Sequence, residues 1–328
     1  MGKKDTKAKE YLADNERFAD LCNVLLFNGE QVIGAESLVE KDSTEALSML
    51  GSEDNEPTFQ QKWRDLLKSA VIKQTQGIYI VLIGVESQSM VHYAMPVKNA
   101  IYDALNYGSQ VKRIGKRHRK AADKSSRAEF LSGFHKEDRL IPIITITVYW
   151  GADDWDAPRT LHEMFGDLDR RLKSYIPDYR INLLAPKEIE DFNKFQTELG
   201  NVLEAIKVSD DQASMDRLFQ SNKKFSAMSN ESVEAINTFI GTNIPVNQKE
   251  GVTDMCKAWE DQKNEGIAEG RAEGRAEGIV EGRAKGIAEA RLDAIRNMVE
   301  LGISKENILI KYTKEEYERA QQMMAVGF

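Results

Sequence analysis

The stretch from Arg64 to Tyr107 reads RDLLKSAVIKQTQGIYIVLIGVESQSMVHYAMPVKNAIYDALNY. Most side chains from Ile78 to Val85 are β-branched or aromatic, so this segment predicts a buried strand rather than a turn of helix. A second apolar run begins at Leu66, and a polar turn from Gln74 to Gly77 separates the two runs. The pattern predicts a β-hairpin, and the remaining elements are interpreted outward from it.

Two acidic residues mark one end of this hairpin. Asp65 opens the first run and Glu86 ends the second, so antiparallel pairing would bring both carboxylates to the same end of the sheet. Carboxylates in such a place can hold a hard cation such as Mg²⁺ beside a substrate phosphate. Gln88, two residues beyond Glu86, is expected on the same face and can orient a water molecule. In the alternative interpretation, Asp65 caps a strand end and Glu86 is a solvated edge residue.

The flanking sequence predicts a mixed α/β domain around the hairpin. Apolar residues at helical spacing favour helices on both sides of it, and β-branched runs favour two further strands. The expected elements are a helix over 5–28 that ends at Asn28-Gly29, a polar loop over 41–58, a helix from Pro96 to Tyr107, and strands over Leu140–Tyr149 and Tyr179–Leu184.

The C-terminal half is predicted to be helical. Residues 186–239 are expected to form a helical layer against the first domain or a small bundle after it. Residues 265–291 repeat a four-residue unit with glycine at every fourth position from Gly266 to Gly286, at a cost of about 5–6 kcal/mol in helix propensity. This repeat is either a semi-flexible spacer or a self-association helix. Comparing the oligomeric state of the full chain with that of a chain ending near Val246 would distinguish the two. Two short helices about Gly302 and Thr313 are expected to follow, with Ser304 as an N-cap.

Composition restricts the class of protein. The chain has 328 residues and a net charge of −8, and its apolar runs are too short to span a bilayer. The N-terminal residues have no hydrophobic core of a secretory signal. Its two cysteines, Cys22 and Cys256, support neither a disulfide framework nor a zinc cluster, so a cytoplasmic protein without membrane contact is expected.

One segment is strongly basic although the whole chain is acidic. Residues 112–127 carry eight lysines and arginines against one acidic residue, Asp123, with His118 among them. Such a segment can hold a DNA backbone through counterion release. The candidate DNA-binding residues are Lys112, Arg113, Lys116, Arg117, Arg119 and Lys120. The segment either extends the helix that begins near Pro96 or forms a mobile loop.

An ordered series of sequence blocks between Asn15 and Asn182 resembles the Rpn family of recombination-promoting nucleases and putative transposases, within the PD-(D/E)XK nuclease superfamily. The blocks are NERFADL from Asn15, Arg64-Asp65, GVESQ from Gly84, HYAMP from His92, YDAL from Tyr102, FLSGF from Phe130, DRLIP from Asp138, YWG from Tyr149 and PDYRIN from Pro177. Tetrad repeats near the C-terminus are also similar to those of members of this family.

The resemblance implies a restriction-endonuclease-like α/β core, with a central mixed sheet flanked by helices, and Mg²⁺-dependent cleavage of DNA, with Mn²⁺ as an alternative ion. It places Asp65 and Glu86 as metal ligands and Gln88 where the superfamily more often has lysine. A displaced positive charge could come from Lys98 or Lys73. An additional acid on the first helix would be Glu16, with Asp20 as the alternative.

The resulting hypothesis is a metal-dependent DNA endonuclease of the transposase-related, recombination-promoting type. Its catalytic residues would be Asp65, Glu86, Gln88 and Glu16. His92 is interpreted as a structural residue rather than a proton shuttle. The alternative is a weak or inactive nuclease fold that binds DNA or a partner, a reading that Gln88 favours.

The sequence also predicts how the chain is divided. The expected organisation is a nuclease-like domain over 1–186, a helical layer over 187–247, a repeat region over 248–300 and a two-helix tail over 301–328. The repeat region is expected to be a helix or a linker and is a candidate segment for homo-oligomer formation.

Overall fold

The computed structural model describes residues 2–41, 65–74, 77–121 and 126–325. Most of the loop predicted over 41–58 lies outside these ranges. The chain divides into two compact units, Met1–Trp259 and Glu260–Phe328, which are described separately below.

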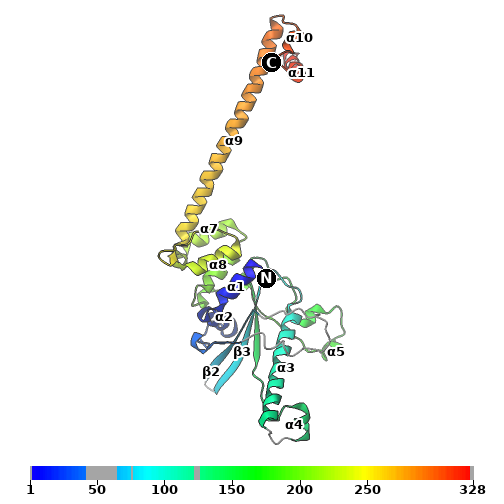
Figure 1. Ribbon diagram of the computed structural model, residues 1–328, viewed down its shortest axis with the longest axis vertical. Coiled ribbons are helices and arrows are strands. Elements are labelled where there is room, and N and C mark those ends of the chain that lie inside the picture. The colour runs from blue at the N-terminus through cyan, green and yellow to red at the C-terminus, as the bar shows by residue number, and fades with distance from the viewer. Residues whose placement is uncertain (1, 42–64, 75–76, 122–125, 326–328) are drawn as a thin grey trace. The chain divides into compact units, whose positions relative to one another are not determined.

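The first unit is organised around a five-stranded mixed sheet with the strand order β1-β2-β3-β4-β5 (Figure 1). The first three strands are antiparallel, whereas β3, β4 and β5 are parallel. The strands are β1 Val39–Glu40, β2 Leu66–Gln74, β3 Gly77–Gln88, β4 Ile143–Tyr149 and β5 Asn182–Leu184. The predicted α/β core with a mixed central sheet is therefore confirmed.

The predicted hairpin is also confirmed. Strands β2 and β3 pair from Leu66 opposite Val85 to Gln74 opposite Gly77. Leu66 and Val85 are buried in the main hydrophobic core, together with Ile83 on β3 and Ile146 on β4. Because side chains alternate across a strand, residues that neighbour these apolar ones point to the other face of the sheet.

Helices cover the apolar face of the sheet. The helix predicted over 5–28 is two helices, α1 Lys3–Ala13 and α2 Asn15–Phe27, because Asp14 interrupts it and its side chain accepts a hydrogen bond from the Arg17 amide. The second helix ends at Asn28, which adopts a left-handed conformation, as the sequence predicted. The helical layer that completes this core consists of α6 Leu199–Lys207, α7 Gln212–Ser221 and α8 Asn230–Ile240.

The opposite face of the sheet contacts α3, Met95–Ala121. Polar side chains make this contact: Asn99 donates to the Thr147 hydroxyl at 3.0 Å, and the Thr145 hydroxyl donates to Asp103 at 2.6 Å. The helix is longer than the predicted 96–107 because the basic segment continues it, so the helical alternative for the described part of that segment is correct. Figure 1 shows α3 beside the sheet, with α4 near its C-terminal end.

Short elements complete the first unit. They are η1 Ala35–Ser37, α4 Arg127–Ser132, η2 Leu161–Met164, α5 Arg170–Lys173, η3 Pro186–Glu188, η4 Phe192–Lys194, η5 Lys223–Ala227, and the paired strands β6 Met228–Ser229 and β7 Val252–Thr253.

The repeat is helical throughout. It lies within α9, Met255–Glu300, which begins in the first unit and continues into the second. Side chains of residues 264–290 are exposed. Apart from the adjacent residues and the nearby backbone of α9 itself, no described residue comes within 4 Å of the Cβ positions of the repeat glycines. Met255 near the start of α9 and Ile295 near its end are each buried in a hydrophobic core, so packing at its ends offsets the low propensity of the glycines.

The second unit ends in the two predicted short helices, α10 Lys305–Ile308 and α11 Lys314–Ala325. Gly302 takes a positive φ of 78°, the left-handed conformation in which many helices end. Ser304 occupies the N-cap position, but its side chain makes no capping hydrogen bond. Their small core contains Ile295, Ile308 and Tyr317.

Candidate active site

The hairpin brings the two candidate acids to one end of the sheet. Leu66 is paired with Val85, so Asp65 and Glu86 are the next residues outward on neighbouring strands. Side chains that face each other in this way lie on the same face, with Cβ atoms typically about 4.5–5.5 Å apart. That face is the one covered by α3, because Thr147, next to Glu86 on β4, bonds Asn99 of α3.

Glu86 is deeply buried and is paired with a lysine. Its side chain is 1% exposed, and its Oε2 atom lies 2.8 Å from Nζ of Lys98 in the second turn of α3. The interpretation of Glu86 as a solvated edge residue is therefore wrong. A carboxylate in a buried position needs a cationic or hydrogen-bonding partner to stay charged, which Lys98 provides.

Asp65 is held against β3 by the backbone. Its Oδ2 atom accepts a hydrogen bond of 2.8 Å from the Ser87 amide. Burial raises the pKa of the Asp65 carboxyl, and this effect outweighs the opposing effects of the Ser87 amide and of the ammonium group of Lys98. Lys98 therefore acts electrostatically on both acids.

A third acid comes from α1. Asp5 raises the pKa of Asp65 by like-charge repulsion, and its Oδ1 atom accepts a hydrogen bond of 2.9 Å from the Ser89 hydroxyl just beyond β3. Glu16 is instead exposed in the first turn of α2. The buried Asp20 accepts hydrogen bonds from the amides of residues 196 and 197, which is a structural role.

Two other candidate residues make local hydrogen bonds. The side-chain amide of Gln88 donates to the carbonyl of Ser87 at 2.7 Å. Nδ1 of His92 accepts a hydrogen bond of 3.2 Å from the Ala94 amide, which agrees with a structural residue in the turn before α3. Lys73 lies on β2, but its side chain is outside the described part of the structure.

A groove lies on the face of the sheet that carries the acids. Leu67, Ser69 and Val71 of β2 line one wall and follow Asp65 at intervals of two residues. Residues of α3 line the other wall, and Arg113 lies at the end of this set. The groove therefore lies on the same face of the sheet as the acid pair and reaches Arg113 in the basic segment.

The six candidate DNA-binding side chains all lie on α3 and are all exposed. Arg117 differs from the others because its guanidinium lies 3.3 Å from a carboxylate oxygen of Asp138. At 1.5 Å per residue, Lys112 is about 21 Å and Lys120 about 33 Å along the helix from Lys98. One helix therefore carries both the lysine at the acid pair and the six candidate DNA-binding residues.

Asp65→Asn is expected to raise the Tm of metal-free protein at pH 7. Asparagine keeps an oxygen acceptor for the Ser87 amide but removes a charge that burial disfavours. The pKa of Asp65 is higher in the folded protein than the value of about 3.9 expected in the unfolded chain. The neutral carboxyl therefore stabilises the folded state fully at pH values below the unfolded-state pKa, and this stabilisation is lost as the pH rises through the folded-state pKa. The advantage of Asp65→Asn should therefore shrink as the pH falls.

Thermal unfolding in EDTA at a series of pH values measures this effect. Glu190→Gln, which alters an exposed acid, is the control and should show no such trend. A Tm of Asp65→Asn below that of the wild type at pH 7 would contradict the prediction.

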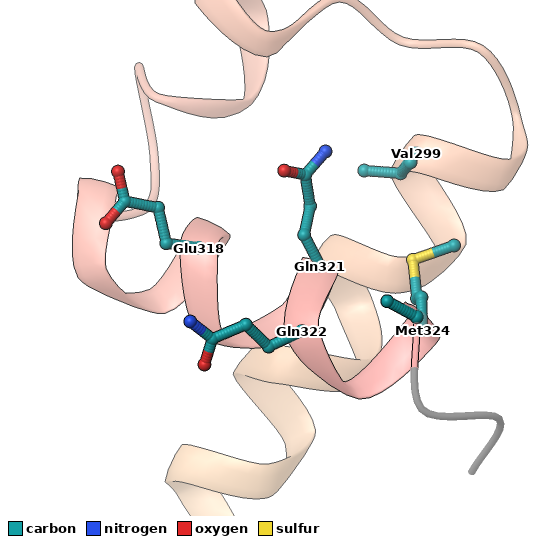
Figure 2. Close-up of a pocket in the computed structure, with 6 residues that line it drawn as sticks. Val299, Glu318, Gln321, Gln322 and Met324 are labelled. Carbon is teal, nitrogen blue, oxygen red and sulfur yellow. The ribbon is translucent and has the colours of Figure 1, made fainter.

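A second hollow lies within the C-terminal unit. Figure 2 shows Val299 near the end of α9 facing Gln321 and Met324 of α11, with Glu318 and Gln322 at the rim. Among the described residues that line it, Glu318 is the only ionisable one. This hollow therefore lacks the paired acids and the lysine that distinguish the site on the sheet.

Sequence reasoning identified the acid pair but not Asp5 or Ser89. Neither carries a motif, and Asp5 is separated from Asp65 by a long segment of chain, so only the packing of α1 beside β3 reveals it. Lys98 was one of two candidates, and the structure pairs it with Glu86.

The comparisons with known proteins give one match. The family model described as putative transposase, YhgA-like, matches residues 45–233, which is more than half of the chain. No curated protein and no solved structure matches. None of the described helices is both long and apolar enough to cross a membrane.

Proposed function

Because the chain belongs to the YhgA-like putative transposase family, we propose that it is a magnesium-dependent DNA endonuclease whose site lies at the end of the β2–β3 hairpin. The observation that carries this proposal is the convergence of Asp65, Glu86 and Lys98 on one face of the sheet. Two carboxylates can hold Mg²⁺ beside a substrate phosphate, and a lysine ammonium group can stabilise the charge that develops during hydrolysis.

The site residues fit a hard divalent cation. Asp65 and Glu86 would provide oxygen ligands from adjacent strands, and the raised pKa of Asp65 means that a nearby cation would favour its ionised form. Bound Mg²⁺ or Mn²⁺ would supply Lewis-acid stabilisation of the phosphate and a lowered pKa for a bound water. Asp5, whose carboxylate accepts a hydrogen bond from Ser89, would act as the additional acid in place of Glu16.

Lys98 would perform the role of the lysine that Gln88 replaces. Its ammonium group acts on both acids in the absence of metal and is a donor for charge that develops on the phosphate during cleavage. Gln88 cannot carry charge, but its side chain shares a face of β3 with Glu86 and can orient water or phosphate.

The basic segment of α3 would hold the DNA backbone. The distance along α3 from Lys98 to its basic residues, about 21–33 Å, corresponds to about 6–10 base pairs at 3.4 Å per nucleotide of one strand. Contacts of this kind position the substrate without reading its sequence. The proposal therefore includes no sequence preference.

A plasmid cleavage assay tests the function. Purified full-length protein with Mg²⁺ is expected to nick supercoiled plasmid, and Asp65→Ala protein prepared in the same way is not. Equal nicking by the two proteins would assign the activity to a contaminant or to another site.

One observation favours a second candidate function. Gln88 stands where the superfamily more often has lysine, which suits a nuclease fold that binds DNA or a protein without cutting. Binding of DNA without cleavage in Mg²⁺, Mn²⁺ and other divalent ions would support this alternative over the endonuclease.

Lys98→Ala is expected to lower the cleavage rate by about 10²-fold while increasing the affinity for Mg²⁺. The rate falls because a donor to the developing charge is lost. Metal affinity rises because the ammonium group no longer competes for Glu86. Single-turnover cleavage measures the rate, and a Mg²⁺ titration measures the affinity. Unfolding would lower both, so a lower rate together with a higher affinity would support the proposed role of Lys98.

Gln88→Lys in the Lys98→Ala background should recover part of the rate, since residue 88 faces the same side as Glu86. The matched control is Gln88→Leu in that background, which adds an apolar side chain without charge and should recover nothing. A Lys98→Ala protein that cleaves at the wild-type rate would make the ion pair with Glu86 purely structural.

A further inference from the structure

Two histidines and an aspartate form a cluster away from the acid pair. His118 lies on α3, whereas His135 and Asp138 lie in the segment after α4. One ring nitrogen of each histidine and one carboxylate oxygen of Asp138 all lie within 4.8 Å of one another. Nε2 of His118 is 2.8 Å from Oδ2 of Asp138, and the two imidazole rings stack with their centroids 3.6 Å apart.

A close approach of two glycines builds this cluster. Gly115 lies one turn before His118 on α3, and a Cβ atom at Gly115 would lie 3.0 Å from the carbonyl oxygen of Gly133. Gly133 has a φ of 67° and ends α4, so the chain turns there and delivers His135 beside α3. The backbone contact therefore brings the two histidines onto the same side of the helix.

Asp138 is held in place by three donors. The His135 amide donates to its Oδ2 atom at 2.7 Å, and the guanidinium of Arg117 approaches its Oδ1 atom at 3.3 Å, in addition to the His118 contact. The side chain of Asp138 is only 8% exposed and that of His118 only 15% exposed. A carboxylate fixed by a backbone amide and by a cation is the kind of oriented ligand that metal sites use.

A structural histidine in the same chain provides a contrast. His162 also lies near an aspartate, with Nδ1 3.7 Å from Oδ2 of Asp178, and its Nε2 atom bonds the carbonyl of Ile176. Its Nε2 atom therefore has a backbone partner, and its ring neighbour is Phe165 rather than a second imidazole. Stacking of a second imidazole beside a histidine–aspartate pair distinguishes the cluster on α3.

We propose that His118, His135 and Asp138 bind one divalent transition-metal ion, with Zn²⁺ as the principal candidate. Two imidazoles and one carboxylate suit Zn²⁺, Co²⁺, Ni²⁺ or Fe²⁺, whereas Mg²⁺ prefers oxygen ligands alone. Tetrahedral bonds of about 2.0–2.1 Å place neighbouring ligand atoms roughly 3.3 Å apart, so the two stacked imidazoles would rotate toward a shared ion when it binds. Three protein ligands leave one position for water or another ligand. The ion would fix the segment after α4 to the basic part of α3.

Cobalt binding to full-length protein tests the proposal. The protein is freed of any affinity tag and metal, titrated with Co²⁺, and followed by visible absorption. We expect one equivalent to bind, with visible d–d bands and no near-ultraviolet thiolate band, because the site contains no cysteine. Zn²⁺ should displace the cobalt, and a large excess of Mg²⁺ should not.

Variants identify the ligands. His118→Gln and His135→Gln should each weaken Co²⁺ binding by at least about tenfold. His162→Gln is the matched control and should bind as the wild type does. Should His118→Gln fail to fold, the half-buried His135, whose side chain is held mainly by stacking, provides the second test.

Three results would overturn the proposal: the absence of saturable Co²⁺ binding, unchanged binding by both glutamine variants, or an equal loss of binding in His162→Gln. Because the readout is metal binding rather than DNA cleavage, this result is independent of whether the nuclease proposal holds.

Discussion

Glu86→Gln is expected to reduce magnesium-dependent cleavage of DNA by at least about 10²–10³-fold. The amide has the volume of the carboxylate and keeps an oxygen acceptor for Lys98, so the buried position should remain filled and hydrogen-bonded. What is lost is one negative charge beside Asp65, and with it most of the affinity for a hard cation. The measurement is the single-turnover rate of plasmid nicking over a range of Mg²⁺ concentrations.

Three further variants are compared with Glu86→Gln in the same assay. Glu190→Gln makes the same chemical change at an exposed position and should cleave normally. Asp5→Asn should lower the rate, because it removes the carboxylate proposed as the additional acid, which lies near enough to Asp65 to raise its pKa. Glu16→Gln should have little effect because Glu16 is exposed on α2. Wild-type cleavage by a folded Glu86→Gln protein would rule out the acid pair as the metal site.

Replacing four exposed cations of α3 by glutamine is expected to weaken DNA binding for every sequence tested. The four are Lys112, Lys116, Arg119 and Lys120. Arg117 is left in place because it contacts Asp138. Each lost phosphate contact should reduce the slope of log K against log salt by about one, so the slope should fall by up to about four.

The control for this variant is the same number of charge changes elsewhere. Arg271, Arg275, Arg283 and Lys285 are exposed on α9 and provide four cations whose replacement changes net charge equally. Fluorescence anisotropy with a duplex longer than about ten base pairs, at several salt concentrations, measures both variants. An equal loss of affinity in the two variants would mean that net charge, not the basic segment of α3, governs binding.

The arrangement of the site explains why its acids should limit stability as well as support activity. Glu86 is almost fully buried, and burial raises the pKa of Asp65. Buried charges of this kind destabilise a fold unless they are paired, and Lys98 pairs with Glu86. The expected rise in Tm for Asp65→Asn, together with a loss of cleavage, would show both effects in one variant.

The sequence by itself determined the hairpin, the acids and the end of the first helical segment. β-Branched residues from Ile78 to Val85 favour an extended chain, and a polar turn before them fixes the direction of the partner strand. Asn28-Gly29 ends α2 because these residues accept the left-handed conformation. Each of these features depends on neighbouring residues alone, which is why a single sequence reveals it.

Only the tertiary structure decided which charged residues meet. Lys98 and Lys73 were equivalent candidates in the sequence, because nothing local records which helix face packs on the sheet. For the additional acid the sequence favoured Glu16, with Asp20 as the alternative, and gave no indication of Asp5. The glycines of the repeat likewise have a low helix propensity. The structure nevertheless contains one continuous helix, α9, whose two ends are packed in hydrophobic cores. Contacts between distant segments arise from the packing of whole elements, and the spacing of residues along the chain does not encode them.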